Sequence, residues 1–232
     1  MIAVTPFEQL GRFNGGWLDA HYHFSFADYL DRNRMGVGAL RVWNDDRVLP
    51  HTGFDMHPHR DFEIITYLRR GAVTHQDSLG NRGVTRAGQV QVMSAGRGIV
   101  HSEHNLEDED LELFQIWIRP NALGVEPRWE TRSTAGGANG GLATLVSGRA
   151  DAPEDALFIH ADAELRAGVL AAGETAIHTF GTGRHAYLVP ARGTIEVNGT
   201  TVPTRAGVYV TDVDAITIRA VDEAEVVLVD VP

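Results

Sequence analysis

The chain has 232 residues, of which 43% are hydrophobic, so it can bury a substantial core and is typical of a globular protein, not a disordered one. Its 31 acidic and 20 basic residues give a formal net charge of −11, and its scattered arginines argue against direct binding of nucleic acid, which needs clustered positive charge. The absence of cysteine excludes disulfides and cysteine-ligated metal clusters, and the lack of a long apolar run or a secretory leader predicts a cytoplasmic protein that does not enter membranes.

Short segments rich in β-branched and aromatic residues predict strands along the first half of the chain. They cover residues 37–43, 63–68, 89–93 and 111–118. Glycine-containing turns separate them, and a short helix is predicted only near residues 27–32. Many short strands at regular spacing favour a β-sandwich or a β-barrel.

Two pairs of potential metal ligands lie within this strand pattern, His57-Pro58-His59 and His101-Ser102-Glu103. Side chains alternate between the faces of a strand, so residues i and i+2 point the same way, roughly 6.5–7 Å apart at the backbone. Imidazoles and a carboxylate at that distance can converge on one ion. Such a ligand set suits iron, manganese, nickel, copper or zinc, and it leaves a position for water, dioxygen or a substrate oxygen. The two pairs therefore predict a catalytic metal centre.

Two glutamates compete for the role of the carboxylate ligand. Glu103 lies two residues after His101 and shares its strand face. Glu63 lies four residues after His59, a span of roughly 13 Å on a flat strand, and would need a bend or bulge to reach the metal. We expect Glu103 to bind the metal and Glu63 to orient a histidine as a hydrogen-bond acceptor. His75, His104 and His51 are nearby as well, and ordinary structural roles are expected for them.

The second half of the chain repeats the pattern of the first. A glycine-rich run at residues 135–141 predicts a loop between the halves, and strands are predicted again after it. Gly71 is followed by Thr-Arg-Ala-Gly88, and Gly193 is followed in the same way by Thr-Arg-Ala-Gly207. This self-similarity favours an internal duplication. No His-x-His or His-x-Glu stands at the matching places, so we expect two domains: residues 1–134 with the metal site, and residues 142–232 without one. The strands predicted in the second domain cover residues 142–146, 185–189, 194–198, 208–210, 215–218 and 225–230.

The two ligand segments resemble the motifs of the cupin superfamily and, within it, of the pirin family. The run from Gly53 through His57-Pro-His59 to Gly71 resembles the first cupin motif. The run Met93-Ser-Ala-Gly-Arg-Gly-Ile-Val-His101-Ser-Glu103 is close to the pirin signature. The resemblance covers about residues 36 to 120, and a bicupin layout would extend it over the whole chain. It implies an all-β bicupin of two stacked antiparallel β-barrels of the jelly-roll type with few short helices. It also implies one metal ion, usually iron(II), bound by His57, His59, His101 and Glu103.

The resemblance further implies a quercetin 2,3-dioxygenase, which opens the ring of a flavonol such as quercetin with O2. Glu103 would then be the catalytic residue that takes the proton of the 3-hydroxyl group. An aromatic substrate needs an apolar pocket, for which Phe54, Met56, Met93 and Phe114 are candidates. Two alternatives remain open. The chain could be a regulatory protein that binds a protein partner according to the redox state of its metal, or a structural bicupin that holds zinc or no metal. We expect a monomer.

Overall fold

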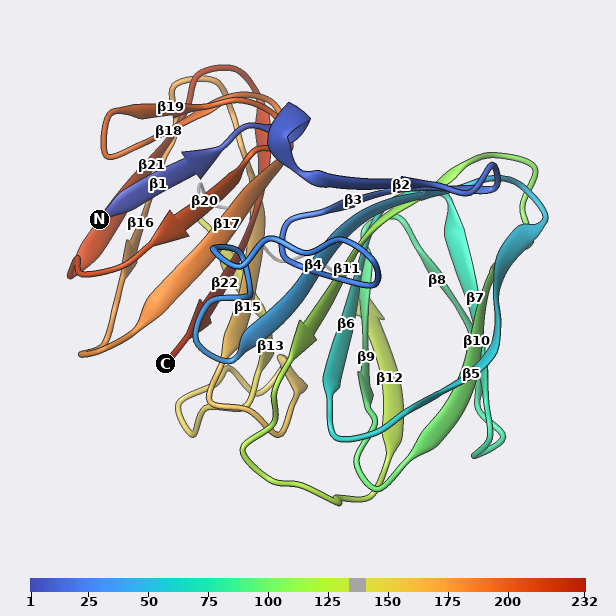
Figure 1. Ribbon diagram of the computed structural model, residues 1–232. Helices are drawn as coiled ribbons and strands as arrows, with labels where there is room; N and C mark the ends of the chain where they lie inside the picture. Colours follow the sequence, from blue (N-terminus) through green and yellow to red (C-terminus); the bar gives the residue numbers. More distant parts are fainter. Residues whose placement is uncertain (134–140) are drawn as a thin grey trace.

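Each half of the chain folds into two β-sheets that face each other, in a computed structural model that describes residues 1–133 and 141–232 (Figure 1). The all-β prediction is confirmed: in the described residues a single 3-10 helix, η1 (Phe7–Gln9), accompanies the strands. That part of the chain has no helix long and apolar enough to span a membrane. The helix predicted over residues 27–32 is wrong. Ala27 has a left-handed backbone (φ 48°), and a bridge between Phe26 and Tyr29 closes a turn.

The first half forms a seven-stranded sheet in the order β12-β9-β6-β11-β4-β3-β2 and a four-stranded sheet in the order β5-β10-β7-β8. The strands are β2 (Gly11–Asn14), β3 (Leu18–Tyr22), β4 (Leu40–Val48), β5 (Thr52–His59), β6 (Glu63–Arg70), β7 (Ala72–Asp77), β8 (Arg82–Arg86), β9 (Gln89–Ser94), β10 (Ile99–Asn105), β11 (Leu111–Ile118) and β12 (Arg128–Ser133). The predicted strands near residues 63, 89 and 111 are present with almost unchanged bounds, whereas the one predicted from residue 37 begins at Leu40 and runs on to Val48.

The second half forms a seven-stranded sheet in the order β1-β20-β17-β22-β15-β13-β14 and a four-stranded sheet in the order β16-β21-β18-β19. The strands are β1 (Ile2–Thr5), β13 (Ala143–Ser147), β14 (Leu157–Phe158), β15 (Glu164–Leu170), β16 (Thr175–Thr179), β17 (His185–Arg192), β18 (Ile195–Val197), β19 (Thr200–Val202), β20 (Gly207–Val210), β21 (Ala215–Ala220) and β22 (Ala224–Val231). The two sheet orders match those of the first half strand for strand along most of their length, as an internal duplication predicts. The linker predicted at residues 135–141 lies outside the described residues, apart from Gly141.

The first strand crosses between the halves. β1 pairs in antiparallel fashion with β20, from Ile2 opposite Val210 to Thr5 opposite Gly207, and so belongs to the sheet of the second half. Its apolar residues Ile2 and Val4 pack against the core of that half. The segment 1–134, expected to form the first domain, therefore contributes its first strand to the second domain, because β20 offers an unpaired edge and an apolar surface.

The turns after β6 and β17 show the duplication locally. Gly71 (φ 69°) and Gly193 (φ 75°) both adopt the left-handed backbone that favours glycine. A Cβ atom on Gly71 would come within 2.8 Å of the Asp110 carbonyl oxygen, so the turn also needs the small residue for space. The sequence repeat thus marks equivalent turns of two similar folds.

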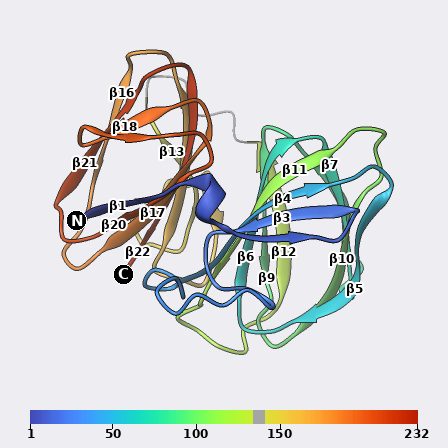
Figure 2. The same cartoon turned by 45° about the horizontal axis from the view of Figure 1, so that its top comes forward.

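The two seven-stranded sheets pack face to face and join the halves through one apolar core (Figure 2). From the first half this core takes Trp43, Ile65, Phe114, Ile116 and Ile118, and from the second it takes Leu165, Val189, Val227 and Val229. One buried ion-pair cluster crosses the same interface: Asp45 pairs with Arg69 and, at 2.6 Å, with Arg205 of the second half. The four-stranded sheet that contains β5 and β10 therefore lies on the side of the first half remote from the second.

Candidate metal centre

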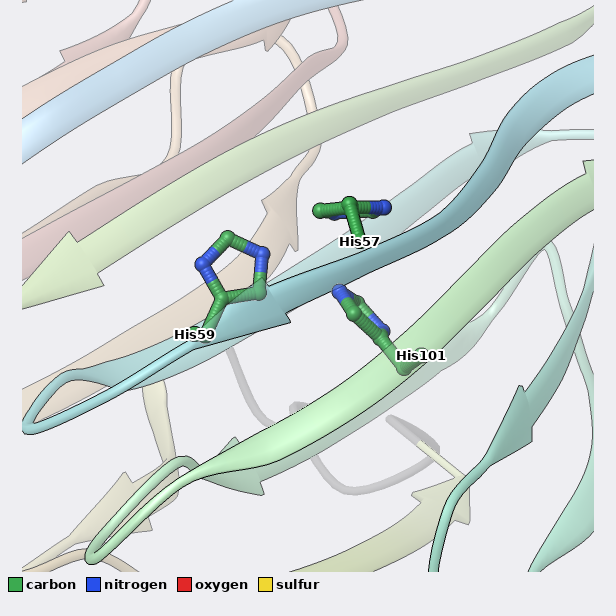
Figure 3. A group of neighbouring side chains, drawn as sticks. All are labelled: His57, His59 and His101. Atoms are coloured by element: carbon green, nitrogen blue, oxygen red, sulfur yellow. The ribbon is translucent and has the colours of Figure 1, made fainter.

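Three histidines meet on the inner face of the four-stranded sheet of the first half (Figure 3). His57 and His59 point the same way from β5, as their i, i+2 spacing predicts, and His101 lies directly opposite His57 on the paired strand β10. One ligand nitrogen from each ring lies within 4.8 Å of the other two. The ring centroids are 4.5 Å apart for His57 and His101, 4.8 Å for His57 and His59, and 4.9 Å for His59 and His101. Rings this close can share one ion.

Burial keeps two of these imidazoles in the neutral form that binds metals. Burial, assisted by the neighbouring rings of His101 and His57, lowers the pKa of His59 to about 4. It likewise lowers the pKa of His101 to about 3, assisted by His57 and His75. At neutral pH both rings therefore present a lone pair and no positive charge.

A chain of three residues determines which nitrogen of His101 is free. His75 Nε2 lies 3.0 Å from Asp77 Oδ2, and His75 Nδ1 lies 3.5 Å from His101 Nδ1. Although burial acts to raise the pKa of Asp77, hydrogen bonds from His75 and Asn81 outweigh it and lower that pKa, so the carboxylate accepts the Nε2 proton of His75. His75 Nδ1 can then accept the proton of His101 Nδ1. Nε2 of His101 is left with its lone pair, and it is buried without a hydrogen-bond partner in the described residues. The donor set fits a divalent metal ion.

His75, for which an ordinary structural role was expected, lies directly beside the candidate ligand His101. Its side chain is fully buried on β7, stacked at 4.8 Å on the ring of Trp129 and in contact with His101. Since β7 and β10 are neighbours in the sheet, His75 lies across from Glu103 in the strand register. The short spacing between His75 and Asp77 was the only sequence signal of this arrangement.

Glu103 lies beside the three histidines and lines the same cavity, but it is not part of their cluster. With His101 and His75 it forms a second group whose ligand atoms lie within 4.8 Å of one another. Gln91 Nε2 donates to its Oε1 at 2.5 Å, and Gln115 Nε2 donates to its Oε2 at 2.8 Å. Both carboxylate oxygens are thus oriented by amides. The role of Glu103 as the fourth ligand stays a prediction.

Glu63, the competing carboxylate, lies away from the histidines that were expected to use it. It is buried on β6, and its Oε2 accepts a hydrogen bond of 2.6 Å from Ser94 Oγ. Burial raises its pKa, although that hydrogen bond acts to lower it. Its side chain is not among those that line the cavity of the histidines, so the expectation that Glu63 orients a ligand histidine is wrong for this structure.

The histidines open onto a cavity of about 210 Å³ between the two sheets of the first half. Of the predicted lining residues, Phe54 does line it, whereas Met56 is exposed and Met93 packs with Ile99 behind the wall. Phe114 belongs to the core between the halves, because it alternates with Gln115 and Trp117, which do face the cavity. Apolar side chains supply most of the wall: Leu18, Ala20, Tyr22, Phe26, Phe54, Ile64 and Trp117.

Two polar residues of β4 interrupt this apolar wall. Asn44 and Asp46 are each only 4% exposed, and both line the cavity. Burial raises the pKa of Asp46 to about 8, with further contributions from the negative charges of Asp45 and Glu103. Sequence reasoning missed both residues, although their i, i+2 spacing on a strand resembles that of the histidine pair.

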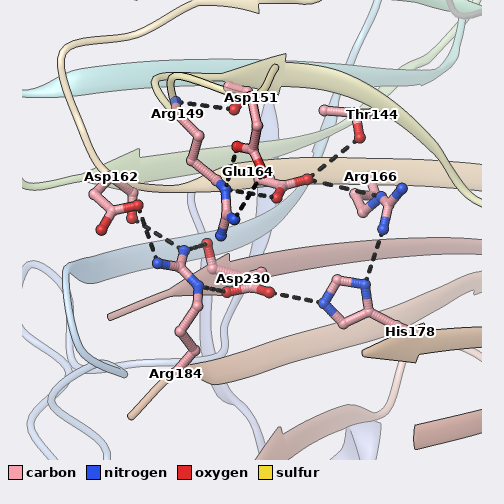
Figure 4. Close-up of polar contacts among 10 residues, drawn as sticks. Thr144, Arg149, Asp151, Asp162, Glu164, Arg166, His178, Arg184 and Asp230 are labelled. Atoms are coloured by element: carbon pink, nitrogen blue, oxygen red, sulfur yellow. Dashed lines mark hydrogen bonds and ion pairs between the residues drawn. The ribbon is translucent and has the colours of Figure 1, made fainter. Parts of the chain in front are cut away.

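The matching position of the second half is filled by ion pairs (Figure 4). Strand β16, which corresponds to β5 by sheet order, carries His178. Its Nδ1 lies 3.1 Å from Arg166 Nη1, and its Nε2 lies 2.7 Å from Asp230 Oδ2. The other oxygen of Asp230, Oδ1, pairs with Arg184. Both ring nitrogens are therefore engaged. Within the described residues, the two groups that could hold a metal both lie in the first half.

Two jelly-roll halves with a three-histidine cluster in one of them define a metal-binding bicupin. The family model described as Pirin matches residues 4–118, and the model described as a quercetinase C-terminal cupin domain matches residues 144–231. The chain belongs to the pirin family.

Named relatives cover the whole chain. A pirin-like protein of Caulobacter vibrioides is 53% identical over 231 residues, which is 99% of each chain, and a quercetin 2,3-dioxygenase of Escherichia coli strain K12 is 42% identical over 233 residues, with 100% of this chain and 99% of the other covered. The crystal structure of the bacterial pirin YhhW of Escherichia coli in complex with nickel(II) has a TM-score of 0.94 and 41% identity, and covers 100% of this chain and 99% of that one.

Proposed function

We propose that the protein is a metal-dependent dioxygenase that opens the ring of a flavonol such as quercetin with O2. The observation that carries the proposal is the convergence of three imidazoles, one with a buried and unpartnered Nε2, on the wall of an aromatic-lined cavity. The name of the Escherichia coli relative supports the substrate class. Iron(II) is the metal we expect. The nickel(II) complex of the pirin YhhW of Escherichia coli makes nickel(II) the first alternative to test, followed by manganese, copper and zinc.

His57, His59 and His101 would hold the ion, with Glu103 as the fourth ligand. When bound, a divalent metal would supply Lewis acidity, which lowers the pKa of a substrate hydroxyl, and it would hold that hydroxyl near the histidines. Glu103 would take the 3-hydroxyl proton. Its position in the cavity wall supports this role, and its two oxygens accept hydrogen bonds from the amides of Gln91 and Gln115.

The walls of the cavity suit a planar aromatic substrate. Trp117 lies edge-on to His59 with ring centroids 4.9 Å apart, and Phe54 lies 6.4 Å from His57. These rings lie beside His57 and His59 and would offer aromatic faces and edges to a bound ring. The fit of substrate to wall would orient the reacting ring against the metal.

The decisive experiment is oxygen uptake with quercetin by protein loaded in turn with each candidate metal. We expect uptake with at least one metal, at least 100-fold less in His101→Ala, and wild-type rates in His51→Ala, whose ring is on the surface. Absence of turnover with every metal would refute the dioxygenase. The regulatory alternative, the monomeric state and the cytoplasmic location stay predictions.

A further inference from the structure

The residues that the proposed function does not use are Asn44 and Asp46, at the β4 wall of the cavity. Strand β4 alternates, so these two side chains point into the first half while Trp43 and Asp45 point into the interface between the halves. Their cross-strand neighbours are Tyr22 and Ala20 on β3, both of which also line the cavity. The pair therefore forms a polar spot in an otherwise apolar wall.

Both side chains carry an oxygen that is buried and unsatisfied. Asn44 Oδ1 and Asp46 Oδ1 have no hydrogen-bond partner in the described residues. Buried acceptors without a donor are rare and costly, and an apolar side chain of similar size would avoid the cost. Two neighbouring carboxylates are satisfied: Glu103 by two glutamines, and Asp45 by two arginines. No described group of the folded chain therefore donates a hydrogen bond to Asn44 Oδ1 or Asp46 Oδ1.

The geometry points to hydroxyl groups of the substrate as that donor, and we propose that Asn44 and Asp46 select polyhydroxylated aromatic ligands. The inference rests on the proposed function, because it takes the same cavity as the substrate site. Some oxygens of the ligand would bind the metal. A hydroxyl elsewhere on its rings would donate a hydrogen bond to Asn44 or Asp46. A ligand that carries a carboxylate or phosphate at this end is disfavoured, because the Glu103 carboxylate lines the same cavity.

The size of the cavity limits what it can enclose. At about 210 Å³, below the usual range for drug-sized ligands, it has room for the hydroxylated end of one aromatic molecule and not for a polymer. A hydroxyl of that molecule would be buried with it. A ligand without the hydroxyl would leave the two acceptors unpaired, which is the situation in which sites discriminate most strongly.

The test compares the binding of two flavonols to the wild-type protein and to variants of Asn44 and Asp46. Quercetin and 3-hydroxyflavone share the 3-hydroxyl and the 4-carbonyl, but 3-hydroxyflavone lacks the other ring hydroxyls. Binding to nickel-loaded protein without oxygen is measured by quenching of tryptophan fluorescence. We expect wild-type protein to bind quercetin roughly 5- to 150-fold more tightly, as the loss of a hydrogen bond to a buried acceptor predicts. Asp46→Leu and Asn44→Leu should each reduce this preference and leave the affinity for 3-hydroxyflavone within about twofold.

Controls separate recognition from damage to the fold. Asp46→Asn, which keeps an acceptor oxygen, should retain most of the preference, and Asp19→Leu on the neighbouring strand, outside the cavity, should retain all of it. Equal affinity of wild-type protein for both flavonols, an equal loss for both in Asp46→Leu, or no binding of either flavonol would overturn the inference. Binding that depends on the hydroxyls, without oxygen uptake, would refute the dioxygenase activity but support the role of Asn44 and Asp46. Oxygen uptake without a preference for the hydroxylated flavonol would support the activity and refute that role.

Discussion

His75 Nδ1 and His101 Nδ1 lie 3.5 Å apart, and this contact joins a buried ring on β7 to the candidate metal centre on β5 and β10. Asp77 contacts the other ring nitrogen of His75, Nε2. The three side chains thus form a hydrogen-bonded chain that leaves Nε2 of His101 without a partner. Ligand histidines commonly need such a partner, because it determines the tautomer and the direction of the ring.

Replacing His75 should weaken metal binding without removing a ligand. In His75→Phe the ring of His101 loses its acceptor, and we expect nickel affinity to fall 10- to 100-fold, the range typical of partners of ligand histidines. Competition with a chelator measures the change. His51→Phe, at an exposed histidine far from the site, is the matched control. Unchanged affinity in His75→Phe would show that the contact does not orient His101.

The metal-free protein should lose stability in acid because of its buried histidines. The pKa values of His23, His59 and His101 are lowered by burial to about 3, 4 and 3. Between pH 6.5 and those values the unfolded chain binds protons that the folded chain does not. The stability that these three histidines contribute is therefore complete above pH 6.5 and is lost as the pH falls. Urea unfolding at pH 7, 6 and 5 checks this. Nickel should stabilise the protein at pH 7 and progressively less at lower pH, since protons compete for the ligands. Stability independent of pH in this range would contradict it.

Asp46 should act in the opposite direction. Its pKa is raised from 3.8 to about 8, so between these values the folded metal-free protein holds a proton that the unfolded chain has released. Stability from this group is therefore present at low pH and falls as the pH rises to about 8, by about 1.4 kcal/mol per pH unit at most. Asp46→Asn removes the titration, and its unfolding free energy should exceed that of the wild type increasingly from pH 5 to pH 8. A constant difference between the two proteins over that range would refute the assignment.

The ion-pair cluster around Asp45 should hold the two halves together. Asp45 is fully buried and pairs with Arg69 of its own half and Arg205 of the other. Asp45→Ala leaves buried positive charge without a partner and should cost about 3–5 kcal/mol of unfolding free energy. Asp19→Ala removes the exposed pair with Arg12 and should cost no more than about 1 kcal/mol. Equal effects of the two substitutions would show that the interface does not depend on this cluster.

Local spacing was sufficient to predict the parts of the site that one strand holds. His57 and His59 share a face because side chains alternate along β5, and the same alternation applies to His101 and Glu103 on β10. The all-β class followed from short strands and glycine turns, and the duplication followed from two Thr-Arg-Ala-Gly repeats. Each of these features depends on residues close together in the chain. Even Phe114, predicted wrongly as a lining residue, differs by one position from Gln115, which does face the cavity.

Only the tertiary structure decided which side chains surround the candidate metal ligands and where the halves meet. His75 reaches His101 because β7 is the neighbour of β10, and Asp46 faces the same cavity because β4 belongs to the opposite sheet. The pairing of β1 with β20 joins residues more than two hundred positions apart. Strand order and register are set by the burial of whole sheet faces, a sum over many distant contacts that no short spacing records. The sequence by itself therefore predicts a metal centre. The packing of the sheets decides which other side chains lie around it.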